Sequence, residues 1–189
     1  MARLVWLGLI AVIAIPVALA AQSPLLQWRD AVYITASFAG IAALALLLVQ
    51  PLLATRALPG LRPHTARRAH RFTGTALIFA IVLHVAGLFA TSPPDVVDAL
   101  TFTSPTLFSP FGVIAMWAAF AAALVAALRK GIAPSRWRRA HTALALFVAL
   151  TTAAHVALIE GAMEPLSKTV LSLLALAAAA HAVWQVRTR

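Results

Sequence analysis

The 189-residue chain contains no cysteine and only five acidic residues, and charged side chains make up 11% of it. Without cysteine the protein can form no disulfide and can hold no thiolate-ligated metal centre. Glu160 lies at the end of one long apolar stretch and no other acidic residue lies inside one, so carboxylates that would complete a metal cage or a proton path within a membrane are missing. The acidic residues are Asp30, Asp95, Asp98, Glu160 and Glu164.

Hydrophobic residues make up 62% of the chain, a composition typical of integral membrane proteins. Six apolar stretches are long enough to cross a bilayer, and none shows the ten-residue alternation of a membrane β-strand. We therefore predict an all-α integral membrane protein, a six-transmembrane-helix bundle that forms a single domain over residues 1–189. The predicted spans are approximately 3–21, 31–54, 69–91, 110–128, 140–160 and 166–186.

The formal net charge of +10 is distributed unevenly over this six-span topology. Thirteen of the fifteen basic residues fall on one side, and only Arg29 and Lys168 fall on the other. The positive-inside rule then places both termini in the cytoplasm. We expect the protein to lie in a bacterial-type inner membrane. Topology and attraction to anionic membrane lipid account for the positive charge, so no nucleic-acid partner is expected.

The first apolar stretch has a second interpretation. Arg3, the apolar run and the small residues of Ala18-Leu19-Ala20 also resemble a cleavable signal peptide. Cleavage would leave the direction of the later helices unchanged, because the second span enters from outside in either case.

One pattern occurs twice in the sequence, as RRAHRFTGTALIFAIVLH at residues 67–84 and RRAHTALALFVALTTAAH at residues 138–155. Each copy begins with Arg-Arg-Ala-His and ends with a second histidine fourteen residues after the first. Fourteen residues of α-helix make about 3.9 turns and roughly 21 Å of rise, so both histidines share nearly one helix face. The two histidines of a copy therefore lie near opposite sides of a hydrocarbon core roughly 30 Å thick.

The third and fifth spans run in the same direction, which matches the histidines by depth. His70 and His141 lie near the inner face, and His84 and His155 lie near the outer face. Ionisable residues at membrane depth indicate a functional site, and two imidazoles facing each other in a helical bundle suit a low-spin b-type haem. The pairs could instead hold zinc or copper or relay protons. Haem fits better, because further metal ligands and intramembrane carboxylates are missing.

Other polar residues near the inner pair have two interpretations each. The arginines that precede the first histidine of each copy could pair with haem propionates or serve only as topological anchors. His181, in the last span, could replace an inner ligand, contact a propionate, line a quinone pocket or simply pack. These arginines are Arg67, Arg68, Arg138 and Arg139.

The paired histidine motifs on the third and fifth of six helices resemble the ferric reductase-like transmembrane domain. That superfamily includes ferric reductases, the NADPH oxidase membrane domain and the haem-binding membrane partner of a periplasmic methionine sulfoxide reductase. The resemblance implies an inner haem b on His70 and His141, an outer haem b on His84 and His155, and electron flow from the cytoplasm outward. The fused members also carry a flavin- and nicotinamide-binding dehydrogenase, of which this sequence shows no dinucleotide fingerprint.

The expected function is therefore electron transfer from a cytoplasmic or quinol donor, through two stacked haems, to an extracytoplasmic acceptor. A separate flavin reductase, a bound flavin or a quinone would have to supply the electrons. The alternatives are a quinol-oxidising membrane cytochrome b, a haem-binding membrane subunit of a periplasmic oxidoreductase, a haem-free small-solute transporter and a non-catalytic assembly subunit. The transporter is disfavoured because interrupted half-helices are not evident.

Overall fold

The computed structural model describes residues 1–188, and all the regular secondary structure within them is helical. Six of the seven α-helices are long and apolar enough to span a membrane, which confirms the predicted all-α membrane architecture. The long helices are α1 (Ala2–Ala21), α2 (Ala31–Thr55), α3 (Pro63–Thr91), α5 (Ser109–Ala127), α6 (Pro134–Leu158) and α7 (Pro165–Arg187). The short elements are α4 (Pro93–Leu100) and the 3-10 turns η1 (Pro24–Leu26) and η2 (Leu128–Gly131).

Helices α3 and α6 begin six residues before the predicted spans. Each has a proline in its first turn, Pro63 in α3 and Pro134 in α6, where the fixed φ favours a helix and the missing N–H costs nothing. The basic residues that follow continue as helix beyond the apolar stretch. The arginines and the first histidine of each motif therefore lie on regular helix.

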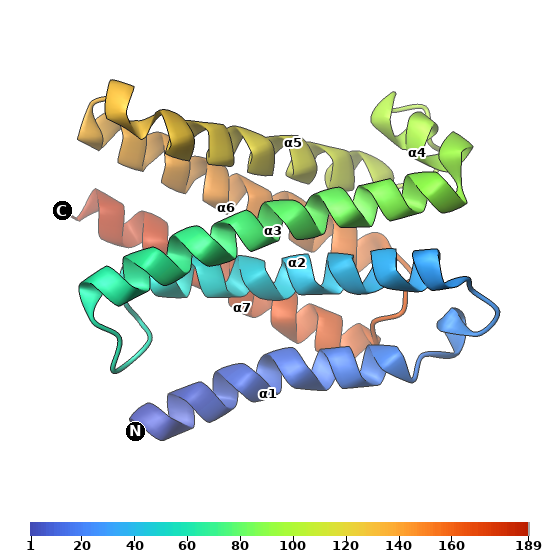
Figure 1. Ribbon diagram of the computed structural model, residues 1–189, viewed down its shortest axis with the longest axis horizontal. Helices are drawn as coiled ribbons and strands as arrows, with labels where there is room; N and C mark the ends of the chain where they lie inside the picture. Colours follow the sequence, from blue (N-terminus) through green and yellow to red (C-terminus); the bar gives the residue numbers. More distant parts are fainter. Residues whose placement is uncertain (189) are drawn as a thin grey trace.

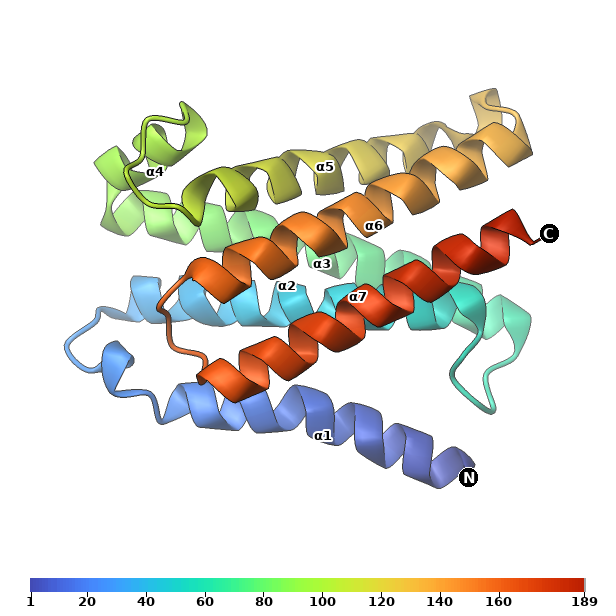
Figure 2. The ribbon, with the colours of Figure 1, turned by 180° about the vertical axis from the view of Figure 1, so that it is seen from behind.

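The six long helices form one bundle in which each runs antiparallel to the next, so that α3 and α6 run in the same direction (Figures 1 and 2). Helix α2 packs against α3 and α7, and α6 packs against α5 and α7. Helix α1 lies at the edge of the bundle with few neighbours, and α4 lies in the connection between α3 and α5. The two ends of the chain lie at the same end of the bundle.

The two ends of the bundle differ in charge as the sequence predicts. The connections α2–α3 and α5–α6, beside the chain termini, carry basic residues such as Arg56 and Arg129. All five acidic residues lie in or next to the connections at the opposite end, where Asp30 and Glu164 cap the first turns of α2 and α7. The bundle therefore has a basic end and an acidic end.

The centre of the bundle is built largely from small side chains, which let helix backbones approach closely in a membrane. One buried cluster joins α2, α5, α6 and α7 and includes Leu47, Ala118, Ala119, Val148, Ala149 and Ala179. Many large apolar side chains point outward instead, among them Phe79 and Trp117, which are 67% and 58% exposed. An apolar exterior of this kind is suited to lipid rather than to water.

Candidate functional site: two histidine pairs between α3 and α6

The structure brings His70 of α3 and His141 of α6 together near the basic end of the bundle. Their ring centroids lie 6.3 Å apart, and the ring planes are inclined at 78°. Among residues 1–188, α3 and α6 are not one of the helix pairs whose backbones pack closely. The two imidazoles therefore meet in the space between two helices whose backbones stand apart.

The second pair, His84 and His155, lies fourteen residues farther along the same two helices, toward the acidic end. The ring of His155 packs edge-to-face against Phe108, with centroids 5.7 Å apart. All four histidines are half-buried.

Each of the four imidazoles is bonded through Nδ1 to a backbone carbonyl of the helix behind it. A carbonyl oxygen can only accept a hydrogen bond, so each Nδ1 carries the proton and donates it. In a neutral ring this leaves Nε2 unprotonated, which is how metal-ligating histidines are commonly oriented. The bonds are His70 to Gln50 (3.1 Å), His84 to Ala36 (2.8 Å), His141 to Ala122 (3.1 Å) and His155 to Phe108 (3.0 Å).

The carbonyl acceptors repeat with the same spacing as the histidines. Ala36 and Gln50 are fourteen residues apart on α2, and Phe108 and Ala122 are fourteen residues apart at the start of and along α5. Because the histidines and their acceptors have the same spacing along antiparallel helices, both histidines of a helix can bond to the neighbouring helix in the same way. The helix pair α2–α3 and the helix pair α5–α6 therefore present equivalent halves of the site.

Gln50 contacts the first turns of α3 with its side chain as well as its backbone. Its Nε2 donates to the carbonyl of His70 (3.2 Å) and to Oγ1 of Thr73 (2.6 Å), while its own carbonyl accepts from His70 Nδ1. A methyl group on Gly74 would lie 3.5 Å from the Gln50 Oε1 atom, so Gly74 also faces α2. Gln50 thus fixes both the backbone and the ring of His70.

Trp137 lies one turn before His141 and stacks on its ring, with centroids 5.8 Å apart and planes inclined at only 15°. The Trp137 Nε1 atom is buried and has no hydrogen-bond partner. A buried N–H without an acceptor costs roughly 1–3 kcal/mol, which an anionic oxygen beside His141 would recover. The sequence gives no signal for this contact, because nothing in the repeated motif shows that Trp137 stacks on a histidine.

The His70–His141 geometry fits a metal ion held in line between two imidazoles. A metal–imidazole bond is about 2.0–2.1 Å long, and a ring nitrogen lies about 1.2 Å from the centroid of a five-membered ring with bonds near 1.35 Å. Two in-line ligands then have centroids roughly 6.4–6.6 Å apart. That spacing is close to the 6.3 Å between the ring centroids of His70 and His141.

The donor set favours a haem over a bare ion. Within residues 1–188 no group of three or more histidine and acidic side chains could hold a metal ion. A zinc site would need such a group, whereas the porphyrin of a haem supplies the in-plane nitrogens and leaves two axial positions for the protein. Two histidines per level therefore fit a b-type haem.

The other predicted residues, four arginines and His181, form no hydrogen bonds to the imidazole rings of the two histidine pairs. The four arginines are exposed on the first turns of α3 and α6, on the same turns as the inner histidines. His181 is exposed on α7, where Nε2 of its ring bonds to Gln185 (3.0 Å) and the ring lies against Trp184 of the same helix. These arginines are Arg67, Arg68, Arg138 and Arg139.

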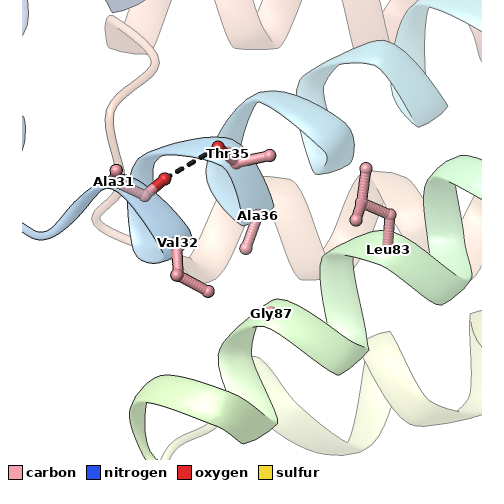
Figure 3. A pocket seen from close by; sticks show the side chains of 6 residues that line it. All are labelled: Ala31, Val32, Thr35, Ala36, Leu83 and Gly87. Carbon is pink, nitrogen blue, oxygen red and sulfur yellow. Dashed lines mark hydrogen bonds between the residues drawn. The ribbon is translucent and has the colours of Figure 1, made fainter.

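An open pocket of about 230 Å³ lies between α2 and α3 behind the outer level, at the acidic end (Figure 3). Its walls are mainly apolar, and its one hydroxyl, that of Thr35, already donates to the carbonyl of Ala31 (2.7 Å). A methyl group on Gly87 would lie 2.7 Å from the Ala36 Cβ atom, so glycine lets the two helices approach here. The pocket is lined by Ala31, Val32, Thr35, Ala36, Leu83 and Gly87.

Comparison with known proteins gives one match. The family model described as "Ferric reductase like transmembrane component" matches residues 39–152, which is more than half of the chain. The matched region contains His70, His84 and His141 and ends three residues before His155. No curated protein and no solved structure matches the chain. The chain belongs to the ferric reductase-like transmembrane component family.

Proposed function

We propose that the protein is a haem b-containing transmembrane electron-transfer protein and that residues 1–189 form one ferric reductase-like transmembrane domain. The proposal rests on one observation above all: four imidazoles on α3 and α6 each have Nδ1 bonded to a backbone carbonyl, and the rings of His70 and His141 have centroids 6.3 Å apart. Membership of the family supports electron transfer across a membrane as the activity.

The residues divide into two levels. His70 and His141 would be the axial ligands of an inner haem, and His84 and His155 those of an outer haem. Haem, when bound, supplies one-electron chemistry, while the protein fixes the ligands and sets the polarity around them. The Nδ1–H bonds to backbone hold each ring in one orientation.

The basic end supplies donors for the anionic edge of the inner haem. The exposed guanidinium groups on the first turns of α3 and α6 are suited to pair with propionates, and the unpartnered Nε1–H of Trp137 is a further donor at this level. The guanidinium groups are those of Arg67, Arg68, Arg138 and Arg139. Equivalent donors at the outer level are not predicted, because basic residues are rare at the acidic end.

The direction of transfer follows from the two charged ends. With the basic end in the cytoplasm, the protein is a multi-pass protein of a bacterial-type inner membrane and both termini are cytoplasmic. Electrons then enter near His70 and His141 from a cytoplasmic flavin reductase or a quinol and leave near His84 and His155 to an extracytoplasmic acceptor. A quinol donor is supported by His181, an exposed imidazole on α7 toward the same end as the inner pair.

Transfer across a sealed bilayer tests this function directly. Protein reconstituted into vesicles loaded with ferricyanide should reduce the enclosed ferricyanide when a membrane-impermeant reductant is added outside. The His84→Ala variant should fail, and the His64→Ala variant, which changes an exposed histidine in the first turn of α3, should behave as wild type. Equal rates for wild type, His84→Ala and empty vesicles would refute transmembrane electron transfer.

A further inference from the structure

Two glycines make room for the two outer histidines. A Cβ atom at Gly40 of α2 would lie 2.9 Å from Nδ1 of His84, and one at Gly112 of α5 would lie 2.7 Å from Nδ1 of His155. Contacts below 3.0 Å are not tolerated, so any side chain at these positions would displace the imidazole. Both close contacts are to a histidine ring, and both involve the nitrogen that holds the ring in place.

Each glycine lies one helical turn after the carbonyl that its histidine uses. In an α-helix the carbonyl of residue i accepts the N–H of residue i+4 and points toward that residue. The N–H of Gly112 accordingly donates to the carbonyl of Phe108 (3.2 Å), which also accepts Nδ1 of His155. Gly40 holds the same position relative to Ala36 and His84. Without a Cβ atom, the carbonyl oxygen is open to a second donor.

The inner level lacks this feature. The residues one turn after Gln50 and Ala122 are Ala54 and Ala126, and there the Nδ1–carbonyl distances are both 3.1 Å. At the outer level the distances are 2.8 and 3.0 Å. The inner imidazoles thus bond to their carbonyls beside a methyl group, whereas the outer imidazoles lie directly against bare backbone. The glycines make the two levels unequal.

We propose that Gly40 and Gly112 are positioning residues for the outer histidines. They determine how closely the rings of His84 and His155 approach the backbone, and hence the strength of these rings as ligands. This inference rests on the proposed function in so far as the outer pair binds haem. A hydrogen bond from Nδ1–H raises the basicity of an imidazole ligand, and outer partners of this kind tune both affinity and reduction potential. The glycines act through the histidines and touch no cofactor themselves.

The steric part of the proposal can be tested without reference to haem. Gly40→Ala should lower the Tm of the purified full-length protein or reduce its accumulation in membranes. The same change in a His84→Ala background should have no further effect, because the ring that the methyl group would strike is gone. Gly8→Ala is the matched control, because no atom lies within 4 Å of a Cβ at that position in α1. An equal effect of Gly40→Ala with and without His84 would overturn the proposal.

The electronic part is read from the spectra of the two haems. Gly40→Ala and Gly112→Ala should each shift the midpoint potential and the low-spin resonance of the outer haem, or weaken its binding about 10–100-fold. The inner haem should keep the wild-type potential, as should both haems of Gly8→Ala. Shifts of both haems together, or of neither, would contradict the proposal.

The two ways of failing are distinguishable. A wild-type protein that binds no haem would refute the proposed function, and the stability comparison of Gly40→Ala with and without His84 would still decide the steric claim. A wild-type protein with two haems whose outer signals ignore both glycine substitutions would refute the positioning role alone.

Discussion

The rings of His70 and His141 face each other with centroids 6.3 Å apart, although the backbones of α3 and α6 do not pack closely. Each ring is turned toward the other because its Nδ1 is bonded to the helix behind it, to Gln50 in one case and to Ala122 in the other. The protein alone therefore fixes the Nδ1 side of both rings and leaves each Nε2 atom unprotonated and available as a ligand. Preorganised ligands of this kind lower the cost of binding a metal cofactor.

Removing one outer ligand should separate the two levels. His84→Ala should abolish the outer haem and leave most of the inner haem, because the inner pair has its own hydrogen bonds on α2 and α5. Haem content per chain should fall from about two to about one. Loss of both haems, or of neither, in a stably inserted variant would contradict the assignment of separate levels, and His64→Ala provides the matched control.

Replacing Gln50 by leucine should loosen His70 without removing it. The backbone carbonyl that accepts from Nδ1 remains, but the amide bonds to the His70 carbonyl and to Thr73 are lost. The expected loss of stability is about 1 kcal/mol, with a shifted resonance of the inner haem only. Gln22→Leu, at an exposed position in the α1–α2 connection, is the control. A change confined to the outer haem would show that Gln50 does not act on His70.

Substitutions of Trp137 should distinguish stacking from hydrogen bonding. Trp137→Phe keeps an aromatic ring against His141 and removes the unpartnered Nε1–H, so it should not destabilise haem-free protein. With haem bound, the same variant should retain the inner haem less tightly, because a propionate donor is missing. Trp117→Phe, at an exposed site, should change neither property. Destabilisation of the haem-free protein by Trp137→Phe would contradict this interpretation.

The acidic end should respond to low pH through Glu164, which caps α7 outside the membrane-spanning segment. Hydrogen bonds from the backbone N–H groups of Leu166 and Ser167 hold the pKa of the Glu164 carboxyl below its ordinary value of 4.5. A lowered pKa means that the cap contributes stability above pH about 4.5 and loses it as the pH falls through the lowered pKa. The protection of the Leu166 and Ser167 amides from hydrogen exchange should therefore be high at neutral pH and fall as the pH drops through the lowered pKa.

The control for this cap is the neighbouring carboxyl of Glu160, which is also exposed. Glu164→Gln should reduce amide protection in the first turn of α7 at neutral pH, and Glu160→Gln should leave it unchanged. Protection that is the same at pH 7 and at pH about 3 would show that the Glu164 carboxylate does not stabilise this turn.

Much of the fold could be predicted because bilayer thickness and backbone satisfaction leave few choices for long apolar stretches. All six spans coincide with long helices. Helices α3 and α6 run in the same direction because one span, α5, lies between them in the sequence. The starts of α3 and α6 differ from the prediction because Pro63 and Pro134 begin helices outside the apolar core. Helix α4 was not predicted, because its eight residues lie in a connection that hydropathy alone treats as a loop.

The four histidines could be proposed as a site from their spacing, but the backbone groups that bond to their rings could not be predicted. A backbone carbonyl such as that of Ala36 or Phe108 has no side-chain signature, so only the structure shows which helix backs each ring. Gly74 lies one turn after His70, but it faces the side chain of Gln50 on α2. The glycines that do clear the imidazoles, Gly40 and Gly112, lie on other helices, where sequence spacing gives no signal.

The central claim is that the four histidines hold two b-type haems, and the haem content of the purified protein with its reduced-minus-oxidised optical spectrum tests it most directly. The arrangement of His70, His84, His141 and His155 predicts two low-spin b haems per chain. One haem per chain would mean that one of the pairs has another role. No haem, after expression with an ample haem supply, would contradict the account and bring forward a haem-free role such as solute transport for the intramembrane histidines.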